Sequence, residues 1–158
     1  MRQNARRRAG TASGWQTKQE KDRGRRMTQI LLVDDDLIVL DTLAEILAGA
    51  GHEVAAFNNA PEALDSYRMQ RPDAVVTDII MPGMDGIEFI HRIRQIDPSA
   101  KIIAISGGSG KGYFENLEAV RRLTPVAILP KPFAKSTLLS LIEKCVNEPE
   151  LEERLQRT

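Results

Sequence analysis

Four apolar segments of the chain end in polar residues of types used in phosphate chemistry. Asp34-Asp35 follows the first segment, Asp78 ends the second, Ser106 ends the third, and Lys131 comes after the fourth. A carboxylate can attack phosphorus, and an ammonium group can neutralise phosphoryl oxygens. Clustered carboxylates repel one another unless a cation lies between them, and hard oxygen ligands suit Mg²⁺. These residues predict one site that handles phosphate with the help of Mg²⁺.

Strand and helix patterns alternate along the chain from residue 27. Short apolar runs predict five strands, at residues 28–33, 53–57, 74–77, 101–105 and 126–129. Apolar residues at helical spacing predict five helices, at residues 37–49, 61–70, 87–96, 113–123 and 134–146. Asp36 is expected to cap the first helix rather than bind metal, and Pro61 suits a first helical turn. Asp85 and Gly86 are expected to close a turn and open the third helix.

This alternation predicts the α/β class, with five helices wound onto both faces of a five-stranded parallel sheet. Strands that are apolar throughout indicate a sheet that is covered on both sides. Ligands of such sheets bind at the carboxyl ends of the strands. The polar residues named above all follow strands, so the predicted fold and the predicted site agree.

Charge divides the 158 residues unevenly, although the net charge is zero. Residues 1–26 contain nine Lys or Arg and two Asp or Glu, a charge of +7, and residues 27–158 contain thirteen and twenty, a charge of −7. The first segment lacks hydrophobic periodicity, so we expect a disordered basic arm, either a solvated tail or translation upstream of Met27 as initiator. Residues 27–146 form the predicted domain, and residues 147–158 a frayed tail rather than a partner-binding helix.

Several classes of protein are excluded or disfavoured. Apolar runs are too short for a membrane span, and Arg6-Arg7-Arg8 precedes no apolar stretch of a secretory signal. The single Cys145 excludes an internal disulfide. We therefore expect a cytoplasmic protein without a membrane partner. A nucleic-acid role for the basic arm is disfavoured but would appear as salt-dependent binding.

Residues 28–146 resemble the receiver domain of bacterial two-component response regulators. The resemblance lies in Val33-Asp34-Asp35, in the stretch Asp78-Ile79-Ile80-Met81-Pro82-Gly83-Met84-Asp85-Gly86, in Ser106 after a strand, and in Lys131-Pro132-Phe133. Together and in this order the motifs are specific. The resemblance implies a flavodoxin-like sheet with strand order 2-1-3-4-5. It also implies a signalling domain that transfers a phosphoryl group to itself, rather than an enzyme with a separate substrate.

The resemblance implies a role for each site residue. Asp78 would accept a phosphoryl group from a phosphohistidine on a sensor histidine kinase or a histidine phosphotransfer protein. Asp35 and Asp78 would bind Mg²⁺ directly, together with the backbone carbonyl of Ile80, and Asp34 would hold the ion through water. A downstream protein target is expected but not identified.

The other implied roles concern the phosphoryl group itself. Ser106 would move to bond a phosphoryl oxygen, and Lys131 would pair with the same group. The peptide bond before Pro132 is expected to be cis.

Three departures from the family pattern affect the output. Ser106 stands where Thr is common, and its hydroxyl is expected to play the same role. Ile128 stands where an aromatic side chain is common, so an aromatic switch cannot operate there. The glycine-rich residues 107–112 lengthen the following loop and predict a late, mobile start of the fourth helix. The face of the fourth helix, fifth strand and fifth helix is the expected output face and the candidate homodimer face.

Two readings from other classes remain open at this stage. A phosphatase resembling the haloacid dehalogenases would use Asp34-Asp35-Asp36 but leaves Asp78 without a role. A nucleotide-binding loop at residues 107–112 lacks the required register of Gly, Lys and Ser or Thr. Within the receiver family, the chain could act as an adaptor, a relay intermediate or a phosphate sink. His52 and His91 are expected to be surface residues without a catalytic or metal-binding role.

Overall fold

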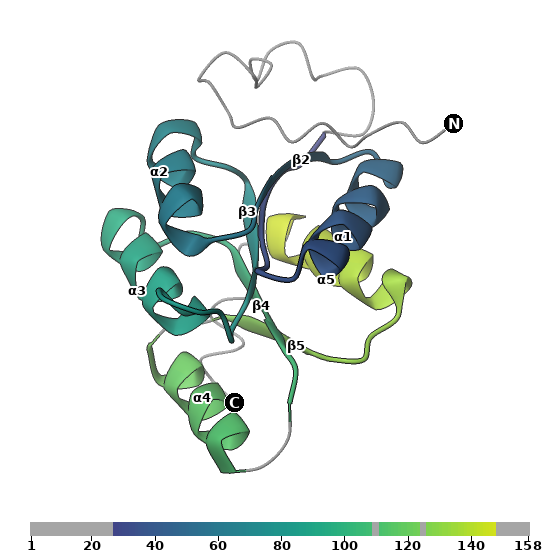
Figure 1. Cartoon of the computed structure of the whole chain (residues 1–158). Helices are drawn as coiled ribbons and strands as arrows, with labels where there is room; N and C mark the ends of the chain where they lie inside the picture. The colour runs from purple at the N-terminus through teal and green to yellow at the C-terminus, as the bar shows by residue number, and fades with distance from the viewer. Residues whose placement is uncertain (1–26, 109–110, 124–125, 148–158) are drawn as a thin grey trace.

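The structure, a computed structural model, describes residues 27–108, 111–123 and 126–147. Its centre is a five-stranded parallel sheet in the order β2-β1-β3-β4-β5 (Figure 1). The strands are β1 (Gln29–Val33), β2 (Glu53–Phe57), β3 (Ala74–Asp78), β4 (Ile102–Ser106) and β5 (Ala127–Pro130). The predicted class and strand order are confirmed. The basic arm and the residues from 148 onward lie outside the described residues, so their predictions stay predictions.

Helices cover both faces of the sheet (Figure 1). On one face lie α1 (Leu37–Gly49) and α5 (Lys135–Asn147), and on the other lie α2 (Ala60–Gln70), α3 (Gly86–Ile96) and α4 (Lys111–Leu123). Each face buries its own apolar cluster, because strands with side chains on two sides need a cover on both. No helix of this described part is long and apolar enough to cross a membrane.

The start of α4 differs from the prediction. The helix begins at Lys111, two residues before the expected Tyr113, so the late start is wrong. Gly112 has open space around the position of a β-carbon and sits inside the helix. Glycine lowers helix propensity by only about 1 kcal/mol, and packing of an amphipathic face can outweigh that cost. Val120 of α4 is buried in the apolar cluster on the sheet face that α2, α3 and α4 cover, and Leu117 packs against that cluster.

Helix caps formed by local side chains are where the sequence predicted them. The Asp36 side chain accepts hydrogen bonds from the N–H groups of Ile38 and Val39 at the start of α1. The Asp85 side chain accepts one from the Glu88 N–H at the start of α3. Each cap satisfies donors that a helix leaves unpaired at its first turn. Both predictions are confirmed. Both caps lie in segments that follow acidic strand ends, Asp36 after Asp34 and Asp35, and Asp85 after Asp78.

Gly86 brings the start of α3 against the end of β3. A β-carbon added to Gly86 would lie 2.1 Å from the carbonyl oxygen of Asp78 and 2.6 Å from the Cα of Ile79. The Gly86 N–H also donates a hydrogen bond of 2.9 Å to the Ile79 carbonyl. A side chain at this position would push the backbone of Asp78 out of place.

We expect Gly86→Ala to lower the free energy of unfolding by about 1–3 kcal/mol, because overpacking against fixed backbone cannot relax by a rotamer change. Gly49→Ala is the matched control, since nothing lies within 4 Å of its added β-carbon and alanine favours a helix. Urea denaturation measures both. Equal stabilities of the two variants would contradict the close approach at Gly86.

Candidate functional site

The register of the sheet brings the predicted residues to one edge. Val33 lies opposite Thr77 in the β1–β3 pairing, so Asp34 and Asp78 leave neighbouring strands at the same level. Asp78 pairs with Ile105 in β4, and Ser106 is the next residue. The site therefore gathers residues more than 40 positions apart because parallel strands end together.

Three carboxylates form the core of the site. One oxygen from each of Asp34, Asp35 and Asp78 lies within 4.8 Å of the others. Asp34 is 1% exposed and Asp78 is 7% exposed, whereas Asp35 is exposed to solvent. The cluster thus opens to water through Asp35 and has two buried acids behind it.

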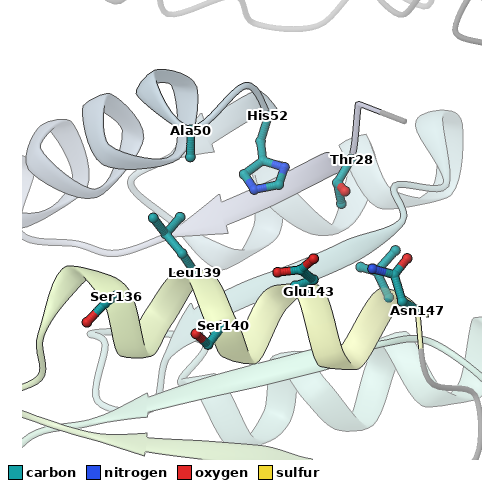
Figure 2. Close-up of a pocket in the computed structure, with 9 residues that line it drawn as sticks. Thr28, Ala50, His52, Ser136, Leu139, Ser140, Glu143 and Asn147 are labelled. Atoms are coloured by element: carbon teal, nitrogen blue, oxygen red, sulfur yellow. The ribbon is translucent and has the colours of Figure 1, made fainter. Parts of the chain in front are cut away.

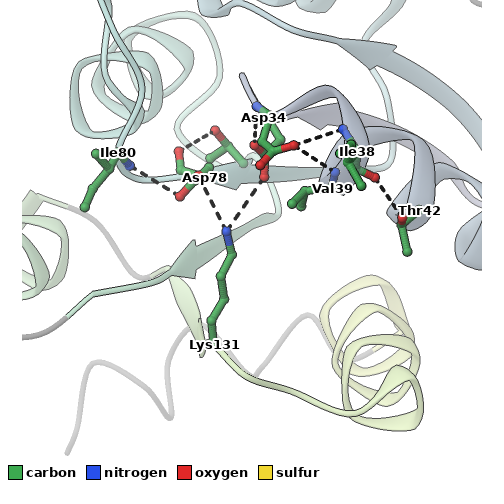
Figure 3. Close-up of polar contacts among 9 residues, drawn as sticks. Asp34, Ile38, Val39, Thr42, Asp78, Ile80 and Lys131 are labelled. Atoms are coloured by element: carbon green, nitrogen blue, oxygen red, sulfur yellow. Dashed lines mark hydrogen bonds and ion pairs between the residues drawn. The ribbon is translucent and has the colours of Figure 1, made fainter.

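Lys131 supplies the positive charge that faces this cluster (Figure 3). Its Nζ lies 3.7 Å from Asp78 Oδ2 and 3.9 Å from Asp34 Oδ2. The absence of a side chain at Gly107 leaves room for the stem, because an added β-carbon would lie 3.0 Å from Lys131 Cδ. The Lys131 backbone N–H donates to the Ser106 carbonyl at 2.7 Å, and the following bond to Pro132 is cis, as predicted.

Backbone donors hold one oxygen of each buried acid (Figure 3). The Asp36 N–H donates to Asp34 Oδ1 at 2.9 Å, and the Ile80 N–H donates to Asp78 Oδ1 at 3.3 Å. Asp34 Oδ2 is buried and makes no hydrogen bond. A buried carboxylate oxygen in that state is costly unless a cation or water meets it.

Burial is the main influence on the protonation of the two buried acids. Burial raises the pKa of Asp34 from 3.8 to about 6, against the Asp36 N–H bond and Lys131, which lower it; Asp78 adds to the rise. Burial likewise raises the pKa of Asp78, and the nearby Lys131 ammonium and the N–H groups of Ile80 and Ile79 act in the opposite direction. Without a cation, the folded protein therefore disfavours full ionisation of this cluster.

This donor set fits a divalent hard cation. Mg²⁺ takes oxygen ligands, retains waters and bridges to phosphate. The three close carboxylates and the unsatisfied Asp34 oxygen offer negative charge that such an ion would neutralise. The exposed Asp35 leaves an approach from solvent. The arrangement can hold a metal ion beside a nucleophilic carboxylate and a lysine.

Most of the predicted site residues come together. Asp34, Asp35 and Asp78 lie together, Lys131 faces Asp34 and Asp78, and Ser106 is buried at the adjacent strand end. The Ile80 carbonyl as a metal ligand stays a prediction. Ile128 is half-buried and packs against the cluster under α2, α3 and α4.

Two residues with a positioning role were not recognised in the sequence. The Thr77 hydroxyl, fully buried, donates to the Asp78 carbonyl at 2.9 Å, and Gly107 admits the lysine stem. A small residue directly after a polar strand end is the signal that could have identified Gly107. His91 is exposed as expected, whereas His52 is half-buried in a groove described below.

Comparisons with known proteins agree with this geometry. Residues 30–143 match the response regulator receiver domain family. The chain is 37% identical over 117 residues to the chemotaxis protein CheY of Thermotoga maritima, covering 73% of this chain and 95% of that protein. It is 36% identical to the response regulator receiver protein CpdR of Brucella abortus, covering 75% and 96%.

A longer relative and a solved structure extend the comparison. A response regulator receiver protein of Anaeromyxobacter is 43% identical over 115 residues, and the match spans 47% of its length. The structure of the chemotaxis protein CheY4 of Vibrio cholerae superposes with a TM-score of 0.66 at 27% identity, covering 75% of this chain and 98% of that one. The similarity thus concerns the domain described here.

Removal of the buried Asp34 charge should stabilise the metal-free protein at high pH. A folded-state pKa raised to about 6 means that Asp34 adds stability below about pH 4, which is lost as the pH rises through 6. We expect Asp34→Asn in EDTA to raise the free energy of unfolding by about 1–3 kcal/mol at pH 8 and by much less at pH 4.5.

Thermal or urea unfolding at the two pH values measures this difference. Asp41→Asn is the control, because Asp41 is an exposed acid on α1. An Asp34→Asn effect that is equal at both pH values would contradict the assigned burial cost.

Proposed function

Because this chain belongs to the receiver-domain family of two-component response regulators, we propose that it accepts a phosphoryl group on Asp78 from a histidine kinase or a histidine phosphotransfer protein. The observation that carries the proposal is the Asp78 carboxylate itself, which lies 3.7 Å from the Lys131 ammonium and within 4.8 Å of the other two acids. Asp34 has the same neighbours and also follows a strand, but it is 1% exposed, against 7% for Asp78.

The proposed reaction moves one phosphoryl group from a nitrogen atom of the phosphohistidine to an oxygen atom of Asp78. An oxygen of Asp78 attacks phosphorus as the phosphorus–nitrogen bond of the phosphohistidine breaks. The imidazole leaves with the bonding electron pair and takes a proton, and Asp78 becomes an acyl phosphate. Lys131 would pair with the phosphoryl oxygens, and Ser106 would donate a hydrogen bond to one of them.

Mg²⁺ would be held by Asp35 and Asp78 directly, by the Ile80 carbonyl, and by Asp34 through water. When bound, the ion would neutralise negative charge on the phosphoryl oxygens and on the acids. Asp34 Oδ2 is buried and makes no hydrogen bond, so it could accept one from an ordered water that links Asp34 to the ion. Asp34 Oδ1 stays with the Asp36 N–H, so only its other oxygen is available.

Exposed apolar side chains beside the site support a protein as the phosphoryl donor. Ile38 is 80% exposed, Ile80 is 54% exposed and Leu37 is 42% exposed. Ile38 and Ile80 flank the acids on two sides in Figure 3. Apolar side chains that rim a polar centre indicate a contact surface for another protein. A small phosphate compound would not need them.

The haloacid-dehalogenase-like reading of the sequence loses support. Such a phosphatase requires Asp34 as the nucleophile, but this residue is 1% exposed, against 7% for Asp78. Receiver domains are signalling modules rather than ordinary enzymes. Whether this one serves as an adaptor, a relay or a sink depends on the lifetime of its phosphoryl state and on its partners.

Asp78→Asn should abolish phosphorylation. Acetyl phosphate and Mg²⁺ are expected to add one phosphate to the parent chain, since Asp78 is the one nucleophile in the site. Intact-mass spectrometry measures the addition, with EDTA as a metal-free comparison. Asp85→Asn is the control, because asparagine also caps a helix and Asp85 lies outside the cluster. Labelling of Asp78→Asn at the parent rate would refute the assignment.

Ile80→Asn should shorten the lifetime of the phosphoryl state. Ile80 stands two residues after Asp78, and its exposed side chain cannot orient a water for in-line attack on phosphorus. A polar amide could orient that water, and Gly108 offers no side chain to do so. We expect phosphate loss several-fold faster in Ile80→Asn than in the parent, with Ile80→Val close to the parent.

Decay of the phosphorylated mass with time in Mg²⁺ measures the three rates. If the parent loses phosphate as fast as Ile80→Asn, the residue at position 80 does not control the attacking water.

A further inference from the structure

A groove lies at the opposite end of the molecule from the acidic site. It has a volume of about 420 Å³ and separates the α1–β2 turn from one side of α5. Figure 2 shows His52 of the turn above Glu143 of α5, with Leu139, Ser140 and Asn147 along the helix. Thr28, just before β1, closes one end, so the groove lies at the amino edge of the sheet.

Both ends of the described structure lie at this groove. Thr28 lines the groove and is the second described residue, and Asn147 lines it and is the last. Residues 1–26 are therefore tethered beside it. A tethered segment has an effective concentration in the millimolar range, so even weak contacts with the groove would be populated.

Charge distinguishes the two segments. Residues 1–26 carry +7 against −7 for the rest of the chain. Residues 148–158 contain four glutamates and two arginines, so they share the negative sign of the body. Glu143 in the groove attracts the arm and repels the tail. Electrostatic complementarity therefore selects the arm.

The arm also contains a side chain suited to the groove. Trp15 is the only tryptophan of the chain and the only aromatic residue before Met27. An indole ring buries apolar surface and offers one N–H donor, which suits a wall of Leu139 and Val146 with the Ser140 hydroxyl and the Glu143 carboxylate beside them. Trp15 lies twelve positions before Met27, a reach of up to about 40 Å, and the groove side of α5 is about 20 Å long.

We propose that residues 1–26 dock in the groove between the α1–β2 turn and α5, with Trp15 as the apolar anchor and Glu143 as a counter-charge. The arm would cover the α5 face at the amino edge and leave Asp78 accessible at the carboxyl edge. A partner of this face would have to displace the arm. The proposal does not depend on phosphoryl transfer.

Trp15 reports its own docking in the full chain. We expect acrylamide to quench its fluorescence at least about twofold less in the full chain than in a synthetic peptide of residues 1–26, because a docked ring is shielded. Glu143→Lys should raise the quenching toward the peptide value. Salt at 1 M should do the same, since it screens charges beyond about 3 Å.

Asp65→Lys is the matched control. It makes the same change of charge on α2, on the other face of the sheet, where Asp65 is 77% exposed. This variant should leave the quenching as in the parent. Ser140→Lys is a second groove variant, and far-UV circular dichroism checks that each variant is folded.

Two results would overturn the proposal. If acrylamide quenches the fluorescence of Trp15 in the parent chain as strongly as in the peptide, the arm is not docked. If both groove variants leave the protection of Trp15 from acrylamide unchanged, or if Asp65→Lys removes it equally, the arm binds elsewhere on the acidic body.

Discussion

Burial of mutually repelling carboxylates at the carboxyl edge of the sheet is the constraint on which the rest of the site depends. Asp34 and Asp78 are buried beside each other, and burial alone makes their ionised forms unfavourable. Lys131 offsets part of this repulsion from 3.7–3.9 Å away, and backbone N–H groups hold one oxygen of each acid. What remains is a deficit of positive charge that a divalent cation or a phosphoryl–metal pair can fill.

Such a site demands accurate backbone placement, because small shifts change charge separations within a few ångströms. Glycine provides that placement at two points. Gly86 allows the start of α3 to touch the Asp78 carbonyl, and Gly107 allows the Lys131 stem to cross the end of β4. The Thr77 hydroxyl bonds to the same carbonyl that Gly86 contacts. Thus the reactive side chains are aligned by neighbours that have no chemical role of their own.

The two edges of the sheet present different surfaces. The carboxyl edge carries the acids, with Ile38 and Ile80 exposed beside them. The amino edge carries a groove lined by apolar and polar side chains, and both ends of the described structure lie at it. The physical separation of these surfaces would allow the proposed phosphoryl transfer at one edge and the proposed docking of residues 1–26 at the other without competition for the same residues.

Sequence by itself determined the class, the number of strands and helices, and the grouping of Asp34, Asp35, Asp78 and Lys131 at one edge. Apolar runs marked the buried strands, and helical spacing marked the helices. Asp36 was identified as a cap, and Asp85 with Gly86 as the turn that opens the third helix. The polar strand ends could be grouped because parallel strands share a carboxyl edge. The motifs around Asp34, Asp78, Ser106 and Lys131 then indicated the family.

Only the tertiary structure decided how adjacent, chemically identical residues differ. Asp34 and Asp35 are neighbours, yet Asp34 is 1% exposed and Asp35 is open to solvent, and burial raises the pKa of Asp34 to about 6. The close contact of Gly86 and the half-burial of His52 also depend on segments distant in sequence. Desolvation and steric contact depend on the atoms that surround a residue in three dimensions, and local sequence does not specify those atoms.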